Sequence, residues 1–174
     1  MVDSKIKCLK LLDQKKYLEY AEIECMNQPE GPSFLPLPAN QKENEDYLKA
    51  FEKLLETENT YYVSGVALGL SDRDNEGTFV KIGQPQGEGP FPDLPYPTWT
   101  NWDVKSGEPN NYPPAGEDYV VMFIEPPSYA PYAKGMWNDY SGLDSFSVIC
   151  VVDPSEELFT VNPTVYPTTD LVKG

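Results

Sequence analysis

The sequence of 174 residues contains no histidine. Without histidine, a Ser-His-Asp triad cannot form, and the serines lack the base that would activate them. Most catalytic zinc sites also use histidine, and so does general base catalysis near neutral pH. The commonest hydrolase and zinc-enzyme chemistries are therefore disfavoured.

Cysteine is scarce, with only Cys8, Cys25 and Cys150 in the chain. Three cysteines without a CxxC spacing cannot form a zinc ribbon. One long-range disulfide with one remaining thiol is the natural alternative, and it indicates an oxidising compartment.

Positive charge and long apolar runs are also in short supply. The 13 Lys and Arg residues face 28 Asp and Glu residues, which gives a net charge of −15. Nucleic acid is therefore not an expected partner, because a phosphate backbone needs a Lys/Arg surface to displace its counterions. No apolar run approaches the roughly 20 residues that cross a bilayer, so we expect no membrane span. Residues 1–5 have no apolar segment after them, so no signal peptide is visible.

The remaining composition fits one domain with irregular loops. Aromatic residues at 13% can fill a core, while 18 Pro and 12 Gly indicate many turns. Helical spacing predicts helices over 14–26 and 41–57, the second capped by Asn40. Strands are predicted over the short β-like runs 61–70, 78–82, 119–124 and 146–152. Helices followed by a strand-rich half predict an α+β domain.

Two long loops interrupt the strand-rich half. Residues 83–97 are rich in proline and glycine, and residues 103–118 are polar and charged. Loops of this length inside a compact domain are usually functional or disordered. Trp99 and Trp102 precede the second loop and favour an ordered one. The stretch 153–174 has several prolines and no periodicity, which predicts an extended tail.

Oxygen-bearing side chains gather in and after the second loop. Carboxylates and amides alternate there, at Glu108, Asn110, Glu117, Asn138 and Asp139. Calcium takes six to eight oxygens at about 2.3–2.6 Å, from carboxylates, amides and backbone carbonyls. Because the set contains no histidine or cysteine, it suits a hard cation better than zinc or copper. These residues therefore predict a calcium site.

The mixture of acids and amides also suits a sugar. An amide that coordinates through its oxygen leaves its NH₂ group free to donate, and a coordinated carboxylate keeps a lone pair that can accept. Two vicinal hydroxyls can then bind the ion, donate to an acid and accept from an amide. Glu108 with Asn110, and Glu117 with Asn138, provide two such pairs. A cis peptide bond before Pro109 would aim the first pair in one direction.

These motifs resemble those of a known family. Glu108-Pro109-Asn110 and Trp137-Asn138-Asp139, with Gly116-Glu117-Asp118 between them, resemble the calcium motifs of C-type lectin-like domains. The resemblance covers about residues 5–152 and leaves 153–174 as a tail. It implies a double-loop α+β fold, in which two helices flank small antiparallel sheets and a long loop binds calcium.

The resemblance also implies roles for individual residues. The primary calcium and sugar ligands would be Glu108, Asn110, Glu117, Asn138 and Asp139, and the order Glu-Pro-Asn implies mannose, glucose or fucose-type glycans with vicinal equatorial hydroxyls. An auxiliary calcium site would use Asp72, Glu76, Asn111 and Asp118 together with Glu117. Asn111 stands where the family commonly has an acid. From their places in the sequence rather than from the resemblance, the loop residues Tyr112 and Tyr129 are the candidates for sugar contact. Three tryptophans are expected in the core instead: Trp99, Trp102 and Trp137.

The cysteines follow the family only in part. The resemblance implies a Cys25–Cys150 disulfide. The family's second disulfide would join positions that are Tyr119 and Gly142 here, so calcium should do more of the ordering of the long loop. Cys8 is expected either to remain a free thiol or to bridge to another chain and form a homo-oligomer.

The sequence thus predicts a non-enzymatic, secreted lectin domain whose signal peptide is not present in this sequence. One alternative is a calcium-ordered module that contacts protein, mineral or ice without binding sugar, and the acidic balance supports it. A second alternative is a hydrolase that uses paired carboxylates such as Glu117 and Asp139. It is disfavoured because the metal site already uses those groups.

Overall fold

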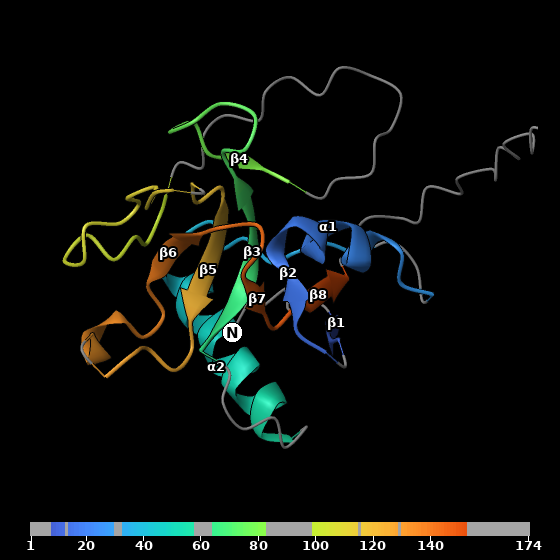
Figure 1. The fold of residues 1–174 in the computed structure, drawn as a ribbon. Helices are drawn as coiled ribbons and strands as arrows, with labels where there is room; N and C mark the ends of the chain where they lie inside the picture. Colours follow the sequence, from blue (N-terminus) through green and yellow to red (C-terminus); the bar gives the residue numbers. More distant parts are fainter. Residues whose placement is uncertain are drawn as a thin grey trace, which may run out of the picture.

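The computed structural model describes residues 8–12, 14–29, 33–57, 64–82, 99–114, 116–128 and 130–152. Their elements, shown in Figure 1, are β1 (Cys8–Leu11), β2 (Lys16–Tyr17), α1 (Leu18–Met26), α2 (Gln41–Thr57), β3 (Gly65–Ser71), β4 (Val80–Lys81), β5 (Tyr119–Phe123), the 3₁₀ helix η1 (Pro131–Ala133), β6 (Trp137–Tyr140), β7 (Ser145–Phe146) and β8 (Ile149–Val152). In this part of the chain, no helix has the length and apolar character that a membrane span requires.

A four-stranded antiparallel sheet forms the centre of the molecule, in the order β4-β3-β5-β6 (Figure 1). Two smaller antiparallel pairs, β1-β8 and β2-β7, lie beside it. The first residue of β3 has to be glycine, because a Cβ atom on Gly65 would lie 2.3 Å from Cγ1 of Val121 on β5. The close approach of the two central strands therefore depends on a missing side chain.

Each face of the central sheet is covered by a different helix. Successive strand residues point to opposite faces, and every residue of β3 is buried. Val66 and Leu68 share one core cluster with Phe51 of α2. Ala67 shares another cluster with Cys25 of α1. Burial on both faces explains why β3 reads as a continuous apolar run.

The second predicted helix is confirmed, and the first begins later than predicted. The Asn40 side chain accepts a hydrogen bond from the Glu43 N–H at 3.0 Å, so Asn40 caps α2 as expected. The predicted start at residue 14 is wrong, because Lys16–Tyr17 pairs with β7 instead. A long-range strand partner therefore overrides the local helical spacing.

The predicted strands are found, with shifted ends. β3, β4 and β5 lie in the predicted runs, and the last run divides into β7 and β8. β1, β2 and β6 were not predicted. The β6 sequence alternates buried and half-buried residues but carries an amide and an acid, which hide its strand character. Residues 5–7, 61–63, the loop 83–97 and the tail 153–174 lie outside the described residues.

A disulfide joins Cys25 at the end of α1 to Cys150 on β8, as the resemblance implies. Both cysteines are fully buried. The bridge spans 125 residues of sequence and fixes α1 against the strand that closes the domain. The fate of Cys8 remains a prediction.

Removing this bridge should strongly destabilise the domain. Closing a loop of that length contributes about 4–5 kcal/mol on the chain-entropy account. We expect the Cys25→Ser/Cys150→Ser double variant to lose about that much free energy of unfolding, measured by urea denaturation. Ile23→Ala, at an exposed position of α1, leaves the bridge intact and is the control that should unfold like the wild type. Equal urea midpoints for all three proteins would contradict the assigned role.

Candidate metal centre

The first part of the long loop is hydrogen-bonded to β6. The Asp103 N–H donates to the Trp137 carbonyl at 2.9 Å, and the Asp103 carbonyl accepts from the Glu108 N–H at 3.2 Å. The buried Asp103 carboxylate accepts from the Ser106 hydroxyl at 2.6 Å and the Ser106 N–H at 3.3 Å. These bonds fold residues 103–108 into a turn whose last residue is Glu108. The sequence alone did not predict the role of Asp103 and Ser106, although an Asp with a Ser three residues later is a turn signal.

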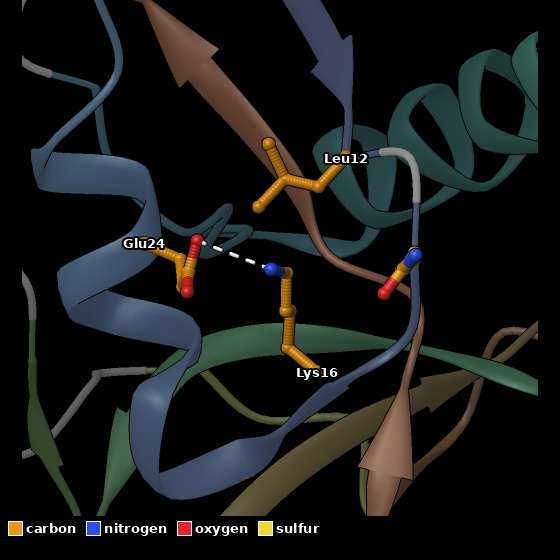
Figure 2. Close-up of a pocket in the computed structure, with 4 residues that line it drawn as sticks. Leu12, Lys16 and Glu24 are labelled. Atoms are coloured by element: carbon orange, nitrogen blue, oxygen red, sulfur yellow. Dashed lines mark ion pairs between the residues drawn. The ribbon is translucent and has the colours of Figure 1, made fainter.

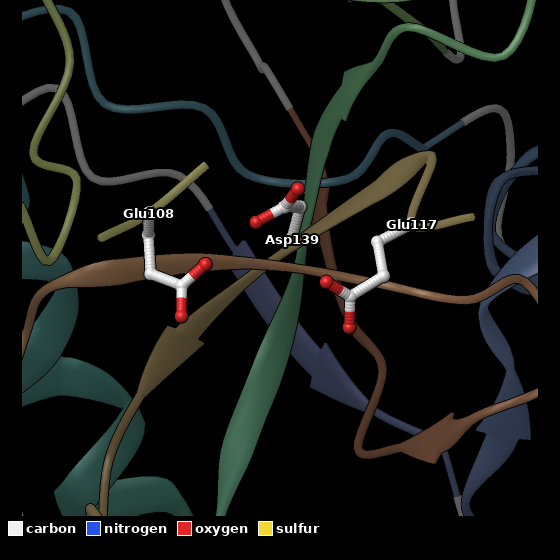
Figure 3. Close-up of side chains that lie close together, drawn as sticks. All are labelled: Glu108, Glu117 and Asp139. Atoms are coloured by element: carbon white, nitrogen blue, oxygen red, sulfur yellow. The ribbon is translucent and has the colours of Figure 1, made fainter. Parts of the chain in front are cut away.

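Three carboxylates meet at this point. Glu108 comes from the long loop, Glu117 lies just before β5, and Asp139 lies on β6. One oxygen of each lies within 4.8 Å of the others. Figure 3 shows the three carboxyl groups together, with Asp139 on the ribbon of its strand. Pairing of Val120 with Asp139 across β5 and β6 brings Glu117 close to Asp139.

Both predicted amide ligands contact the same carboxylate. The Asn110 side-chain NH₂ donates to Glu108 Oε2 at 2.6 Å, and the Asn138 NH₂ donates to Glu108 Oε1 at 2.8 Å. The peptide bond between Glu108 and Pro109 is cis. The five predicted primary ligands therefore lie in one place.

The backbone of residues 110–112 wraps around the other two carboxylates. The Asn110 N–H donates to both oxygens of Asp139 at 3.1 Å, and the Asn111 N–H donates to its Oδ2 at 2.8 Å. Glu117 Oε2 accepts from the Tyr112 N–H at 2.8 Å, while the Glu117 N–H donates to Asn111 Oδ1 at 2.8 Å. Each acid is thus held by N–H groups rather than by cationic side chains.

The negative charge of this site is poorly compensated. Burial raises the pKa of Glu108 to about 8, and the nearby Asp139 and Glu117 carboxylates add to the rise. Burial also raises the pKa of Glu117, and the charges of Asp139 and Asp144 act in the same direction. Within the described part of the chain, none of the ion pairs involves Glu108, Glu117 or Asp139. Acids and amides with unbalanced charge could hold a hard divalent cation.

The auxiliary set is less tightly gathered. Asp72 is buried; its Oδ2 accepts from the Gly77 N–H at 2.8 Å, and its Oδ1 has no hydrogen-bond partner. Burial raises the pKa of Asp72 to about 6, and the charges of Glu76 and Asp118 contribute. Among the residues that the structure describes, only Glu108, Glu117 and Asp139 form a group of three with metal-ligand spacing. The auxiliary calcium site stays a prediction.

The tryptophans lie in the core as expected, and one of the two candidate tyrosines is exposed. The core cluster beneath α2 contains Trp137, and Trp99 and Trp102 pack against it. The ring centroids of Trp99 and Trp102 lie 5.4 and 6.0 Å, respectively, from the ring centroid of Trp137. Tyr112, whose backbone contacts Glu117, is 69% exposed and available for contact with a ligand. Tyr129 lies outside the described residues.

A separate hollow of about 270 Å³ lies between the β1–β2 connection and α1 (Figure 2). It is lined by Leu12, Gln14, Lys16 and Glu24. The Lys16 ammonium and the Glu24 carboxylate lie 3.3 Å apart and neutralise each other. Unlike the carboxylate cluster, this hollow therefore presents no unbalanced charge.

Comparison with solved structures reveals the fold. The carbohydrate-recognition domain of the human scavenger receptor C-type lectin aligns with a TM-score of 0.57 and 22% identity, over 84% of this chain and 91% of that one. The C-type lectin CEL-I from Cucumaria echinata aligns with a TM-score of 0.58 and 21% identity, over 82% and 87%. The chain has the C-type lectin-like fold. No protein-family model and no curated protein matches the sequence.

Other C-type lectin-like structures extend this comparison. The cow CD23 domain, solved in the presence of a GlcNAc2Man3 oligosaccharide, aligns with a TM-score of 0.54 and 25% identity, over 83% of this chain and 85% of that one. Human lithostathine has the same fold, with a TM-score of 0.54 and 17% identity, over 82% and 81%. The predicted α+β fold is thereby confirmed, and most of these neighbours are lectin domains.

The carboxylate cluster should make stability depend on pH when no cation is bound. The pKa of Glu108 rises from 4.5 to about 8 on folding, so the folded state holds a proton that the unfolded chain releases. This contribution to stability is present below pH 4.5 and is lost as the pH rises through about 8. In excess chelator, we expect the free energy of unfolding to fall across that range.

Urea denaturation of the wild type and of Glu108→Gln isolates this effect. The variant has a neutral amide in place of the titrating carboxyl group, so its free energy of unfolding should fall less steeply as the pH rises. Glu56→Gln, at an exposed position in the last turn of α2, is the control and should follow the wild type. Parallel pH profiles for all three proteins would contradict the assignment.

Proposed function

We propose that this domain binds a calcium ion through Glu108, Asn110, Glu117, Asn138 and Asp139, and binds a sugar through that ion. The main support is the meeting of three carboxylates within 4.8 Å, with both amides in contact with Glu108. Calcium is bound by oxygen ligands, and the negative charge of the carboxylates strengthens its binding. Three ionised carboxylates around a divalent ion leave an excess negative charge, which favours retention of the ion.

The same donor set explains how a sugar would be recognised. Each amide that gives its oxygen to the ion keeps its NH₂ group as a donor for a hydroxyl oxygen. Glu108 and Glu117 each keep a lone pair that accepts a hydroxyl proton. Around a bound ion, Asn110 would serve the hydroxyl that meets Glu108. Asn138, whose NH₂ group donates to Glu108 in the structure, would serve the hydroxyl that meets Glu117. Two vicinal hydroxyls would then each meet one donor and one acceptor. Selectivity for adjacent equatorial hydroxyls follows from this arrangement.

The proposed ligands are mannose, glucose or fucose-type glycans. The order of acid and amide in Glu108-Pro109-Asn110 supports this choice. It fixes on which side of the ion a hydroxyl meets the accepting carboxylate and on which side it meets the donating NH₂ group. The cow CD23 domain, a neighbour in fold, was solved in the presence of a GlcNAc2Man3 oligosaccharide. We further propose that the domain acts outside the cell as a binding module, with its carboxylates engaged as ligands rather than as catalytic groups.

A second candidate is a calcium-ordered module that contacts protein, mineral or ice without binding sugar. The net charge of −15 favours it, because a strongly acidic surface suits partners that carry cations. The fold is compatible with both functions. The two candidates share the ion and differ only in whether hydroxyls reach it.

Affinity chromatography separates the candidates. We expect the protein to be retained on mannose-agarose in calcium and released by EDTA, because the sugar hydroxyls need the ion. Calcium should also raise the melting temperature, since it binds the folded state alone. A calcium-dependent rise in melting temperature without retention would favour the second candidate. Failure of both would exclude the calcium site.

Exchange of the acid and the amide tests the residue roles. The Glu108→Gln/Asn110→Asp variant keeps an acid and an amide at the ion but reverses their positions. We expect its preference to shift from mannose towards galactose, measured by competition for the immobilised sugar. Glu125→Gln, an exposed acid beyond β5, is the control and should keep the wild-type preference. Unchanged mannose binding by the double variant would refute the assigned roles.

A further inference from the structure

The ring of Tyr119 lies directly on Gly142. A Cβ atom at Gly142 would lie 2.9 Å from Tyr119 Cε2 and 3.3 Å from Glu19 Cβ. Gly142 does not have a positive φ, so space rather than backbone conformation calls for glycine here. Tyr119 is buried, with 9% of its surface exposed, so its ring has little freedom to move away. A larger residue at 142 would therefore displace the ring.

This contact joins the ends of the two strands that carry metal-site acids. Tyr119 begins β5, two residues after Glu117. Gly142 follows the end of β6, three residues after Asp139. Tyr119 is also the strand partner of Tyr140, the last residue of β6. Any drift of one strand end against the other would thus change the spacing of Glu117 and Asp139.

Helix α1 holds both members of the contact. The Glu19 N–H donates to the Gly142 carbonyl at 3.1 Å, so the first turn of α1 is attached to the glycine. On the other side, Arg73 Nη1 donates to Glu22 Oε2 of α1 at 3.3 Å, and the Tyr119 side chain lies near the same guanidinium and helps to raise its pKa. The ring therefore lies between the glycine and an ion pair, each attached to the same helix.

We propose that the Tyr119–Gly142 contact is a non-covalent cross-link that holds Glu117 and Asp139 at the spacing needed for calcium. The inference rests on the proposed function. The resemblance places a disulfide at these two positions, and here a ring against a glycine joins them instead. Carboxylates brought close together repel each other, so their spacing requires a restraint from the surrounding structure. Tyr119 and Gly142 are thus positioning residues, since neither contacts the ion.

Calcium titration of three variants tests the cross-link, with dissociation constants from calorimetry using calcium alone as the probe. Tyr119→Ala removes the ring, and Gly142→Ala pushes it away. Both should weaken calcium binding by roughly 10–100-fold, the usual effect of losing a residue that orients metal ligands. Tyr119→Phe keeps the ring on the glycine and should keep most of the affinity. Leu143→Ala, at an exposed position next to Gly142, is the control and should bind like the wild type.

The melting temperature in excess chelator distinguishes positioning from a merely structural role. A structural role would lower this temperature in Tyr119→Ala and Gly142→Ala and leave the dissociation constant unchanged, and that result overturns the proposal. If Tyr119→Ala does not fold, Gly142→Ala and Tyr119→Phe still decide the question. Absence of calcium binding by the wild type would overturn the proposed function and this inference together. Tight binding by the wild type and by every variant would overturn this inference alone.

Discussion

Mutual repulsion of three carboxylates, two of them on buried residues, is the constraint around which the long-loop half of this domain is arranged. Glu108, Glu117 and Asp139 come from three separate segments, yet they lie within 4.8 Å of one another. No cationic side chain in the described chain offsets them; backbone N–H groups and two amides do so. Such an arrangement is costly by itself, and a bound cation would offset that cost.

Two sets of contacts hold the three carboxylates close together despite their repulsion. On one side, the turn headed by Asp103 fastens the long loop to β6 through backbone hydrogen bonds. On the other, the strands β5 and β6 are paired along their length. Beneath both lies the core of tryptophans and the apolar face of α2, where the Trp137 indole N–H donates to the buried Asn44 side chain at 2.8 Å. The acids therefore sit on a rigid base rather than on loops alone.

The sequence predicted which acids and amides lie together better than it predicted the strands around them. Ligand chemistry is local: acids and amides in a histidine-free loop indicate a hard cation whatever the fold. Strand pairing is not local, and β2 exists only because Lys16 and Tyr17 meet Phe146 and Ser145. The supporting role of Asp103 was missed for a related reason. A buried acid and a solvated one look alike in a polar loop until the tertiary contacts are known.

The amphipathic helix α2 was predicted closely because its signals lie within one segment. Asn40 caps it, and its buried residues recur at helical spacing. The start of α1 depends instead on carbonyl groups from residues 142 and 144, which accept from Glu19 and Leu18. No local pattern encodes that arrangement, and the helix has no side-chain cap at its N-terminus.

The pairing of β1 with β8 has a mechanical consequence. Cys8 lies opposite Val152, so the described chain enters and leaves the domain at one place, on the side away from the long loop in Figure 1. Tension applied between these two ends would run from β1 through α1 to Cys25, cross the disulfide to Cys150, and leave two residues later. The segment between the bridged cysteines, which carries the whole carboxylate cluster, would bear no load while that bond is intact.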